Sequence, residues 1–145
     1  MEKKLWLAVT VGAMLFGAFF YVGQRVMQEL ESRYRVSELQ RNMRAADESR
    51  AIGMLRVFNT ALTTYKSRHG KLPDELNALG REDLVSPGYE YDARRYVIEY
   101  LPEGEKYILR ATPTTDARRA FYTDQTTVIR ATRESREAQA SDPPI

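Results

Sequence analysis

The sequence predicts an α+β fold in which a long N-terminal helix packs against a small antiparallel β-meander. Apolar residues recur at helical spacing as far as Pro73, with no proline before it. From Pro87 onward, short segments rich in aromatic and β-branched residues alternate with Pro, Gly and Asp, which is typical of strands and turns. The length of 145 residues fits one small domain with an appendage.

The N-terminal part of the predicted helix contains an uncharged run over residues 5–23. As a helix this run is roughly 28 Å long, close to the ~30 Å hydrocarbon core of a bilayer. Trp6 and Tyr21 lie near its two ends, where aromatic rings suit the membrane interfaces. Bulky rings occupy the positions where a signal peptidase needs small residues, so we expect a retained membrane-spanning helix over residues 1–23 and not a cleaved signal peptide.

Small residues are spaced one turn apart within this run, as Ala8-x-x-x-Gly12 and Ala13-x-x-x-Gly17. Such spacing lets two membrane helices approach closely, but small residues are also common in membrane spans. A true packing face and an ordinary composition both remain open. The candidate membrane and helix-packing residues are Trp6, Ala8, Gly12, Ala13, Gly17 and Tyr21.

Residues 24–50 form a charged helical extension. Its apolar stripe, which includes Val36, Leu39 and Met43, is thin and is flanked by alternating Arg and Glu. A solvated stalk and a seam with another copy, held by Arg–Glu pairs, fit this pattern equally well.

From Ala51 the apolar stripe is strong enough to cover a domain. Leu55, Phe58, Leu62 and Tyr65 are the predicted contacts between the helix and the sheet. Gly70 is predicted to close the helix after residues 68–69, because glycine readily adopts the left-handed conformation of a helix C-cap.

The remaining elements complete a globular domain over residues 51–132. Pro73 is predicted to begin a short second helix over residues 72–80. The expected strands are residues 96–101, 106–112, 119–123 and 127–131, joined pairwise by turns at 102–105 and 124–126. Residues 133–145 are expected to form a C-terminal tail, either loose or as an extended edge.

The segments Asp47–Tyr65, His69–Pro73 and Leu76–Gly80 together resemble bacterial type IV pilins and the pseudopilins of type II secretion. The hairpin over 119–130 and the ending 140–144 are similar to a subset of such proteins. The sequence lacks the family's leader-peptidase motif and the Glu in its apolar run. The resemblance implies a subunit of a surface filament, assembling with copies of itself through the N-terminal helix, with pilus or secretion machinery and membrane lipid as further partners.

That resemblance places the C-terminal domain outside the cytoplasm, on a single-pass membrane protein or in an extracellular filament. The alternative is an anchored domain of pilin shape that binds a secretion or envelope partner and never polymerises. In either case a structural role is expected, not an enzymatic one.

Composition and motifs exclude several other classes. The absence of Cys and the presence of one His exclude thiolate metal sites, disulfides and His-rich metal centres. The net charge of +2 gives little attraction to nucleic acid. His69 is expected to complete the helix cap, because the sequence suggests neither the nucleophile nor the orienting partner that a catalytic base needs. No catalytic residue, cofactor or metal is therefore expected, and Asp116 and Asp124 are interpreted as turn residues in preference to calcium ligands.

Overall fold

The computed structural model describes the backbone of residues 2–86, 95–115 and 119–145, and the side chains of those from Tyr21 onward. The chain divides into two compact units, residues 1–42 and 43–145, and each is described by itself. The elements in chain order are α1 (Glu2–His69), α2 (Asn77–Arg81), β1 (Tyr96–Glu103), β2 (Lys106–Pro113), β3 (Ala120–Asp124) and β4 (Arg130–Thr132).

Helix α1 ends where the glycine signal predicts. Gly70 has a φ of +70°, which side-chain-bearing residues rarely adopt. Its backbone N–H donates to the carbonyl oxygen of Lys66 at 2.9 Å, so the last turn is closed. Lys66, Arg68 and His69 bring basic groups to this end, which the helix dipole favours.

The prediction that the N-terminal part of this helix spans a membrane is wrong. Within the residues that the structure describes, no helix is long and apolar enough to cross a membrane. The described side chains of α1 include charged groups from Arg25 onward, and Glu29, Glu31 and Arg33 follow within about two turns. The part of the chain that the structure describes therefore has an α+β fold with an antiparallel sheet, and no membrane-spanning helix is detected in that part.

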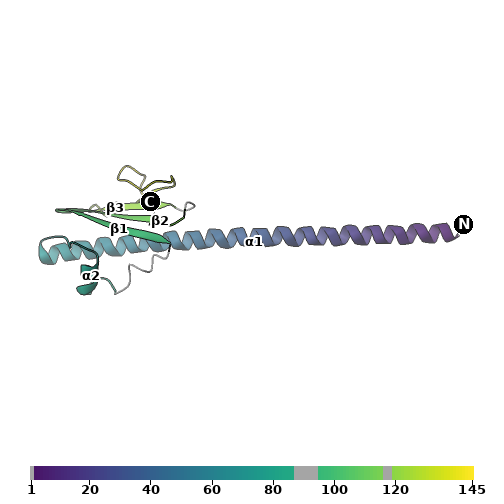
Figure 1. The fold of residues 1–145 in the computed structure, drawn as a ribbon, viewed down its shortest axis with the longest axis horizontal. Helices are drawn as coiled ribbons and strands as arrows, with labels where there is room; N and C mark the ends of the chain where they lie inside the picture. Colours follow the sequence, from purple (N-terminus) through teal and green to yellow (C-terminus); the bar gives the residue numbers. More distant parts are fainter. Residues whose placement is uncertain (1, 87–94, 116–118) are drawn as a thin grey trace. The chain divides into compact units, whose positions relative to one another are not determined.

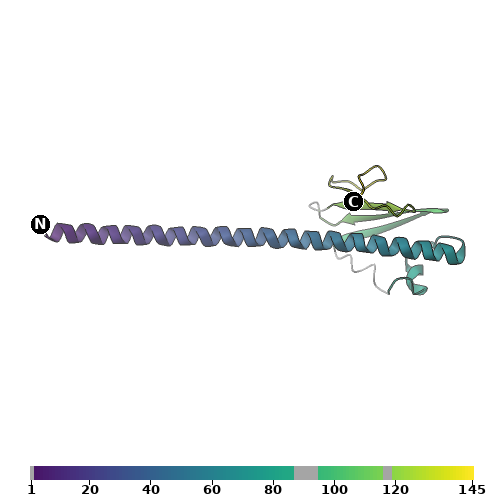
Figure 2. The ribbon, with the colours of Figure 1, turned by 180° about the vertical axis from the view of Figure 1, so that it is seen from behind.

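The sheet is a four-stranded antiparallel meander with the order β1-β2-β3-β4. In Figure 1 and Figure 2 it lies along one side of the C-terminal part of α1, and α2 lies on the other side. Strands β1 and β2 pair in register from Tyr96 opposite Pro113 to Glu103 opposite Lys106. Only Gly104 and Glu105 separate them, so the loop is tighter than predicted, and Gly104 permits this because its φ is +63°.

Helix α2 is shorter than predicted and does not begin at Pro73. The preceding turn is closed by bonds of the i to i+3 type, from Ala78 N–H to the Glu75 carbonyl at 3.2 Å and from Leu79 N–H to the Leu76 carbonyl at 3.0 Å. The carbonyl of Pro73 accepts a hydrogen bond from the hydroxyl of Tyr100 at 2.8 Å. The carbonyl of Pro73, which would accept a bond within a helix that started there, is thus bonded to strand β1.

The main core of the second unit lies between α1 and the inner face of the sheet. Leu55 and Leu62 from α1, with Leu109 and Phe121 from the sheet, are completely buried. Alternate residues of β2 point into this core, as the two-residue period of a strand requires. Leu72, Leu79 and Val85 join the same core from the segment around α2.

The C-terminal segment forms an extended edge and not a loose tail. Arg130 of β4 forms an isolated antiparallel bridge with Pro144. The N–H of Ala131 donates to Pro143 at 3.1 Å, and the N–H of Ile145 donates to Ile129 at 3.1 Å. On the outer face of the sheet, Ala138 packs against Ala120 and Tyr122 in a second, smaller cluster. One open edge of the meander is thereby covered.

Candidate interaction surface

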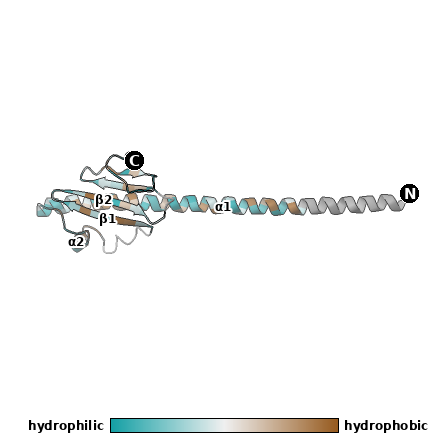
Figure 3. Ribbon diagram, turned by 45° about the horizontal axis from the view of Figure 1, so that its top comes forward, coloured by the Kyte–Doolittle hydropathy of each residue, from teal (hydrophilic) through white to brown (hydrophobic). Residues whose placement is uncertain are grey.

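The first unit presents an uncovered apolar stripe on α1, which we call the exposed face. Its residues recur at intervals of four (Val22 to Val26), three (Met27 to Leu30) and four positions (Leu30 to Tyr34), so they lie on neighbouring turns along one side of the helix. Figure 3 draws apolar residues in brown between hydrophilic ones along this part of α1. The residues and their exposed fractions are Val22 (58%), Val26 (52%), Met27 (60%), Leu30 (57%) and Tyr34 (63%).

Two hydroxyls in these turns are satisfied within the helix itself. The Ser37 hydroxyl, beside the exposed face, donates to the Tyr34 carbonyl at 2.8 Å, and the Ser32 hydroxyl, on the opposite side of the helix, donates to the Glu29 carbonyl at 2.8 Å. Arg33 Nε lies 3.2 Å from Glu29 Oε1, and both side chains remain largely exposed. Covering the exposed face would therefore leave the Ser37 hydroxyl with its partner.

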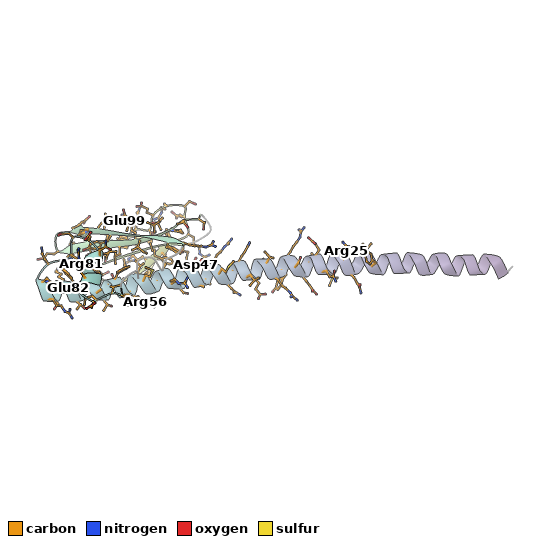
Figure 4. The ribbon with its side chains drawn as sticks, turned by 60° about the horizontal axis from the view of Figure 1, so that its bottom comes forward. Arg25, Asp47, Arg56, Arg81, Glu82 and Glu99 are labelled. Atoms are coloured by element: carbon orange, nitrogen blue, oxygen red, sulfur yellow. The ribbon has the colours of Figure 1, made fainter. Side chains whose placement is uncertain are left out.

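Of the predicted membrane and helix-packing residues, only Tyr21 has a described side chain. Its ring is 59% exposed. Arg25 Nη2 donates to its hydroxyl at 3.1 Å, and the guanidinium lies 5.6 Å from the ring centroid. Figure 4 shows Arg25 projecting from α1. The side chains of Trp6, Ala8, Gly12, Ala13 and Gly17 lie outside the described residues, as does Asp116, which the sequence analysis interprets as a turn residue.

The predicted contacts between helix and sheet lie together in the second unit. Leu55 and Leu62 are completely buried and Phe58 is almost so. Tyr65 is half-buried against this core, and its ring lies 4.3 Å from that of His69, centroid to centroid. His69 Nε2 also lies 3.1 Å from Glu82 Oε2, so His69 links the end of α1 to the segment after α2.

The sequence analysis missed a buried polar network in the core. Asn59 is 2% exposed, and its Nδ2 donates to Thr123 Oγ1 at 3.0 Å. The Tyr107 hydroxyl donates to Asn59 Oδ1 at 3.0 Å. Burial also raises the pKa of Tyr107. In the sequence, the available signal was the amide of Asn59 within the apolar stripe of the helix. Its partners Thr123 and Tyr107 are distant in the sequence, so local spacing does not identify them.

A second missed feature is an ionic clasp, formed by Glu48 with Arg119. Arg119 Nε and Nη2 lie 2.9 and 2.8 Å from Glu48 Oε2, and the Arg119 N–H donates to Oε1 at 3.3 Å. Neighbouring Asp47 lies 3.9 Å from Arg95 Nε. The clasp fastens α1 to the start of β3, because one carboxylate binds both the guanidinium and the backbone of Arg119.

The C-terminal segment is held by a third cluster, around Asp142. This carboxylate is 5% exposed and receives hydrogen bonds from both terminal nitrogens of Arg136 and, at 2.7 Å, from the N–H of Gln139. The Arg136 bonds hold the pKa of Asp142 below its usual value.

At the β3–β4 turn, Asp124 Oδ1 accepts a hydrogen bond from the Thr126 N–H at 2.8 Å, which is the turn role that the sequence predicts for Asp124.

Comparison with known proteins adds no identification. No protein-family model, no curated protein and no solved structure matches the chain. Among the residues that the structure describes, no three His, Asp or Glu side chains are grouped as a metal site would require. The exposed face of α1 is therefore the feature on which we base a functional interpretation.

Proposed function

We propose that the protein is a structural subunit of a pilus-like or pseudopilus-like surface filament, in which copies assemble through the N-terminal part of α1. The observation that carries the proposal is the exposed face itself. Nine large apolar side chains between Tyr21 and Met43, the five of the exposed face among them, stay more than half exposed on a helix whose later turns bury comparable residues completely. Exposed apolar stripes of this kind mark contacts with other molecules.

The arrangement of the second unit supports the same role. A helix backed by a four-stranded meander is a small, self-contained body, in which the core, the Asn59 network and the Glu48 clasp secure the last turns of α1. Self-assembly through the preceding turns would leave this body free on the filament surface. The sequence resemblance to pilins and pseudopilins is consistent with an N-terminal helix that assembles and a separate globular domain.

The proposal is tested by shearing cells that carry a tagged copy of the protein. We expect the protein in the released filament fraction, by immunoblot and by electron microscopy with label against the tag. Retention of all the protein with the cells, with no labelled filaments, would contradict the proposal.

A substitution tests whether the N-terminal helix drives assembly. If the Ala8-x-x-x-Gly12 spacing is a packing face and not an ordinary composition, Gly12→Leu places a large side chain in it and should abolish filaments while the protein accumulates normally. Gly53→Ala is a control on the same helix, since nothing lies within 4 Å of the added Cβ. Normal filaments from the Gly12→Leu variant would exclude this contact.

A further inference from the structure

We propose that residues 27–38 of α1 form a parallel, in-register coiled-coil contact with a second copy of this chain. This contact goes beyond filament assembly, because two copies can pair in this way whether or not a filament forms. The argument rests on three features of the first unit. They are the spacing of its apolar residues, the charges beside them and the hydrogen bond that the Ser37 hydroxyl makes within the helix.

The spacing matches the core positions of a coiled coil. Met27, Leu30, Tyr34 and Ser37 follow one another at intervals of three, four and three residues, which is the alternation of a and d positions in a heptad. The first three are at least 57% exposed, so they are free to contact another helix. Ser37 is compatible with a core position because its hydroxyl already bonds to the Tyr34 carbonyl.

The charges on the two sides of this stripe are of opposite sign. Arg33 directly precedes a core residue and occupies a g position, whereas Glu31 and Glu38 directly follow core residues and occupy e positions. In a parallel pair, each g residue meets the e residue of the other helix about five positions later, so Arg33 meets Glu38 of the second copy. Arg33 is 77% exposed beside Glu29, and it can turn to this partner with little desolvation.

The same charges disfavour the other orientation. In an antiparallel pair, g residues meet g residues and e residues meet e residues. Arg33 would then lie on the same side as its own counterpart, and the two glutamates would lie together on the other side. Charge complementarity therefore selects the parallel arrangement, and the in-register alignment places Met27, Leu30 and Tyr34 against their counterparts in the second copy.

Cysteine cross-linking of the full chain tests the contact directly, because the protein has no Cys of its own. In a parallel in-register pair the two copies of residue 30 meet across the seam. A disulfide requires Cα atoms within about 7 Å, so Leu30→Cys should give disulfide-linked dimers under mild oxidation. Ser32→Cys is the matched control, since residue 32 lies on the side of the helix away from the seam.

Charge substitutions in the Leu30→Cys background test the orientation. Arg33→Glu and Glu38→Arg should each lower the yield of cross-linked dimer several-fold. The double variant should restore it, because the opposite charges again meet. Equal cross-linking of the Leu30→Cys and Ser32→Cys proteins, monomers alone from Leu30→Cys, or a double variant no better than the single ones would each overturn the proposal.

The outcomes separate this contact from filament assembly. Dimers from Leu30→Cys in a strain that releases no filaments would support the seam and contradict the filament role. Released filaments whose Leu30→Cys subunits remain unlinked would support the filament role and contradict the seam.

Discussion

Two stretches of the same helix carry apolar stripes, a thin one over residues 22–34 and a denser one from Ala51, and the two differ in whether they are covered. Residues 22–34 carry Val, Met, Leu and Tyr side chains that stay more than half exposed, whereas Leu55, Phe58 and Leu62 are buried against the sheet. The difference arises from what the chain supplies to cover each stretch. The meander and the segment around α2 cover the second stretch, and within residues 1–42 the structure describes no strand that covers the first. Apolar spacing alone therefore indicates a contact surface without saying whether the partner is the same chain.

The largest expected effect separates the two stretches by stability. Phe58→Ala should lower the free energy of unfolding by about 3–5 kcal/mol, because it removes a buried ring and leaves a cavity. Leu30→Ala should change it by less than about 0.5 kcal/mol when measured at a concentration where the chain is monomeric. Urea denaturation followed by circular dichroism gives both values. Similar losses from the two substitutions would mean that the first stretch is also covered within one chain.

The polar network in the core should give the next largest effect. Asn59→Ala leaves Thr123 and the Tyr107 hydroxyl without their buried partner, so we expect a loss of about 1–3 kcal/mol. The control is Thr60→Ala on the exposed side of the same turn, whose hydroxyl bonds only to the carbonyl of Arg56. Chemical denaturation of both variants is the measurement, and an Asn59→Ala protein as stable as Thr60→Ala would show that the network is dispensable.

The third comparison is between one ionic contact in each unit. Breaking the partly buried contact should lower the free energy of unfolding more than breaking the exposed one, and both costs should be smaller than that of Phe58→Ala. Glu48→Ala breaks a partly buried carboxylate–guanidinium contact with Arg119 and should cost about 1 kcal/mol after allowance for solvent screening. Glu29→Ala breaks the exposed pair with Arg33 and should cost less than about 0.5 kcal/mol. Repeating the denaturation in high salt should remove a larger share of the Glu29→Ala cost than of the Glu48→Ala cost, because salt screens an exposed pair more than a partly buried one. Equal costs would show that burial adds nothing to the Glu48 clasp.

The smallest effect is local and depends on pH. Hydrogen bonds from Arg136 lower the pKa of Asp142, so this contribution to stability is complete above about pH 4, the usual value for an unfolded chain, and is lost as the pH falls through the folded pKa. The protection factors of the Ala131 and Ile145 amides, whose N–H groups bind along the C-terminal edge, should therefore fall in acid. In Asp142→Asn this fall in protection should be absent. An unchanged profile in that variant would assign the effect to another group.

Local signals were predicted well, and contacts between distant residues were not. The end of α1 at Gly70 and the antiparallel order of the meander follow from glycine conformation and strand patterning. The start of α2 was misplaced, and the hydrogen bond that ties the carbonyl of Pro73 to the Tyr100 hydroxyl joins residues 27 positions apart. The Glu48 clasp joins residues 71 positions apart. No local pattern distinguishes such a carboxylate from the solvated ones around it.

The sequence by itself determined the continuous helix, its glycine stop, the hairpins and the stripe at Ala51, because each depends on residues within a few positions of one another. Only the tertiary structure decided which stripe is covered, where the buried amide of Asn59 finds its partners, and that the C-terminal segment closes the sheet edge at β4. The reason is physical. Burial and hydrogen-bond satisfaction are properties of segments brought together across the chain, and local spacing does not specify which segments meet.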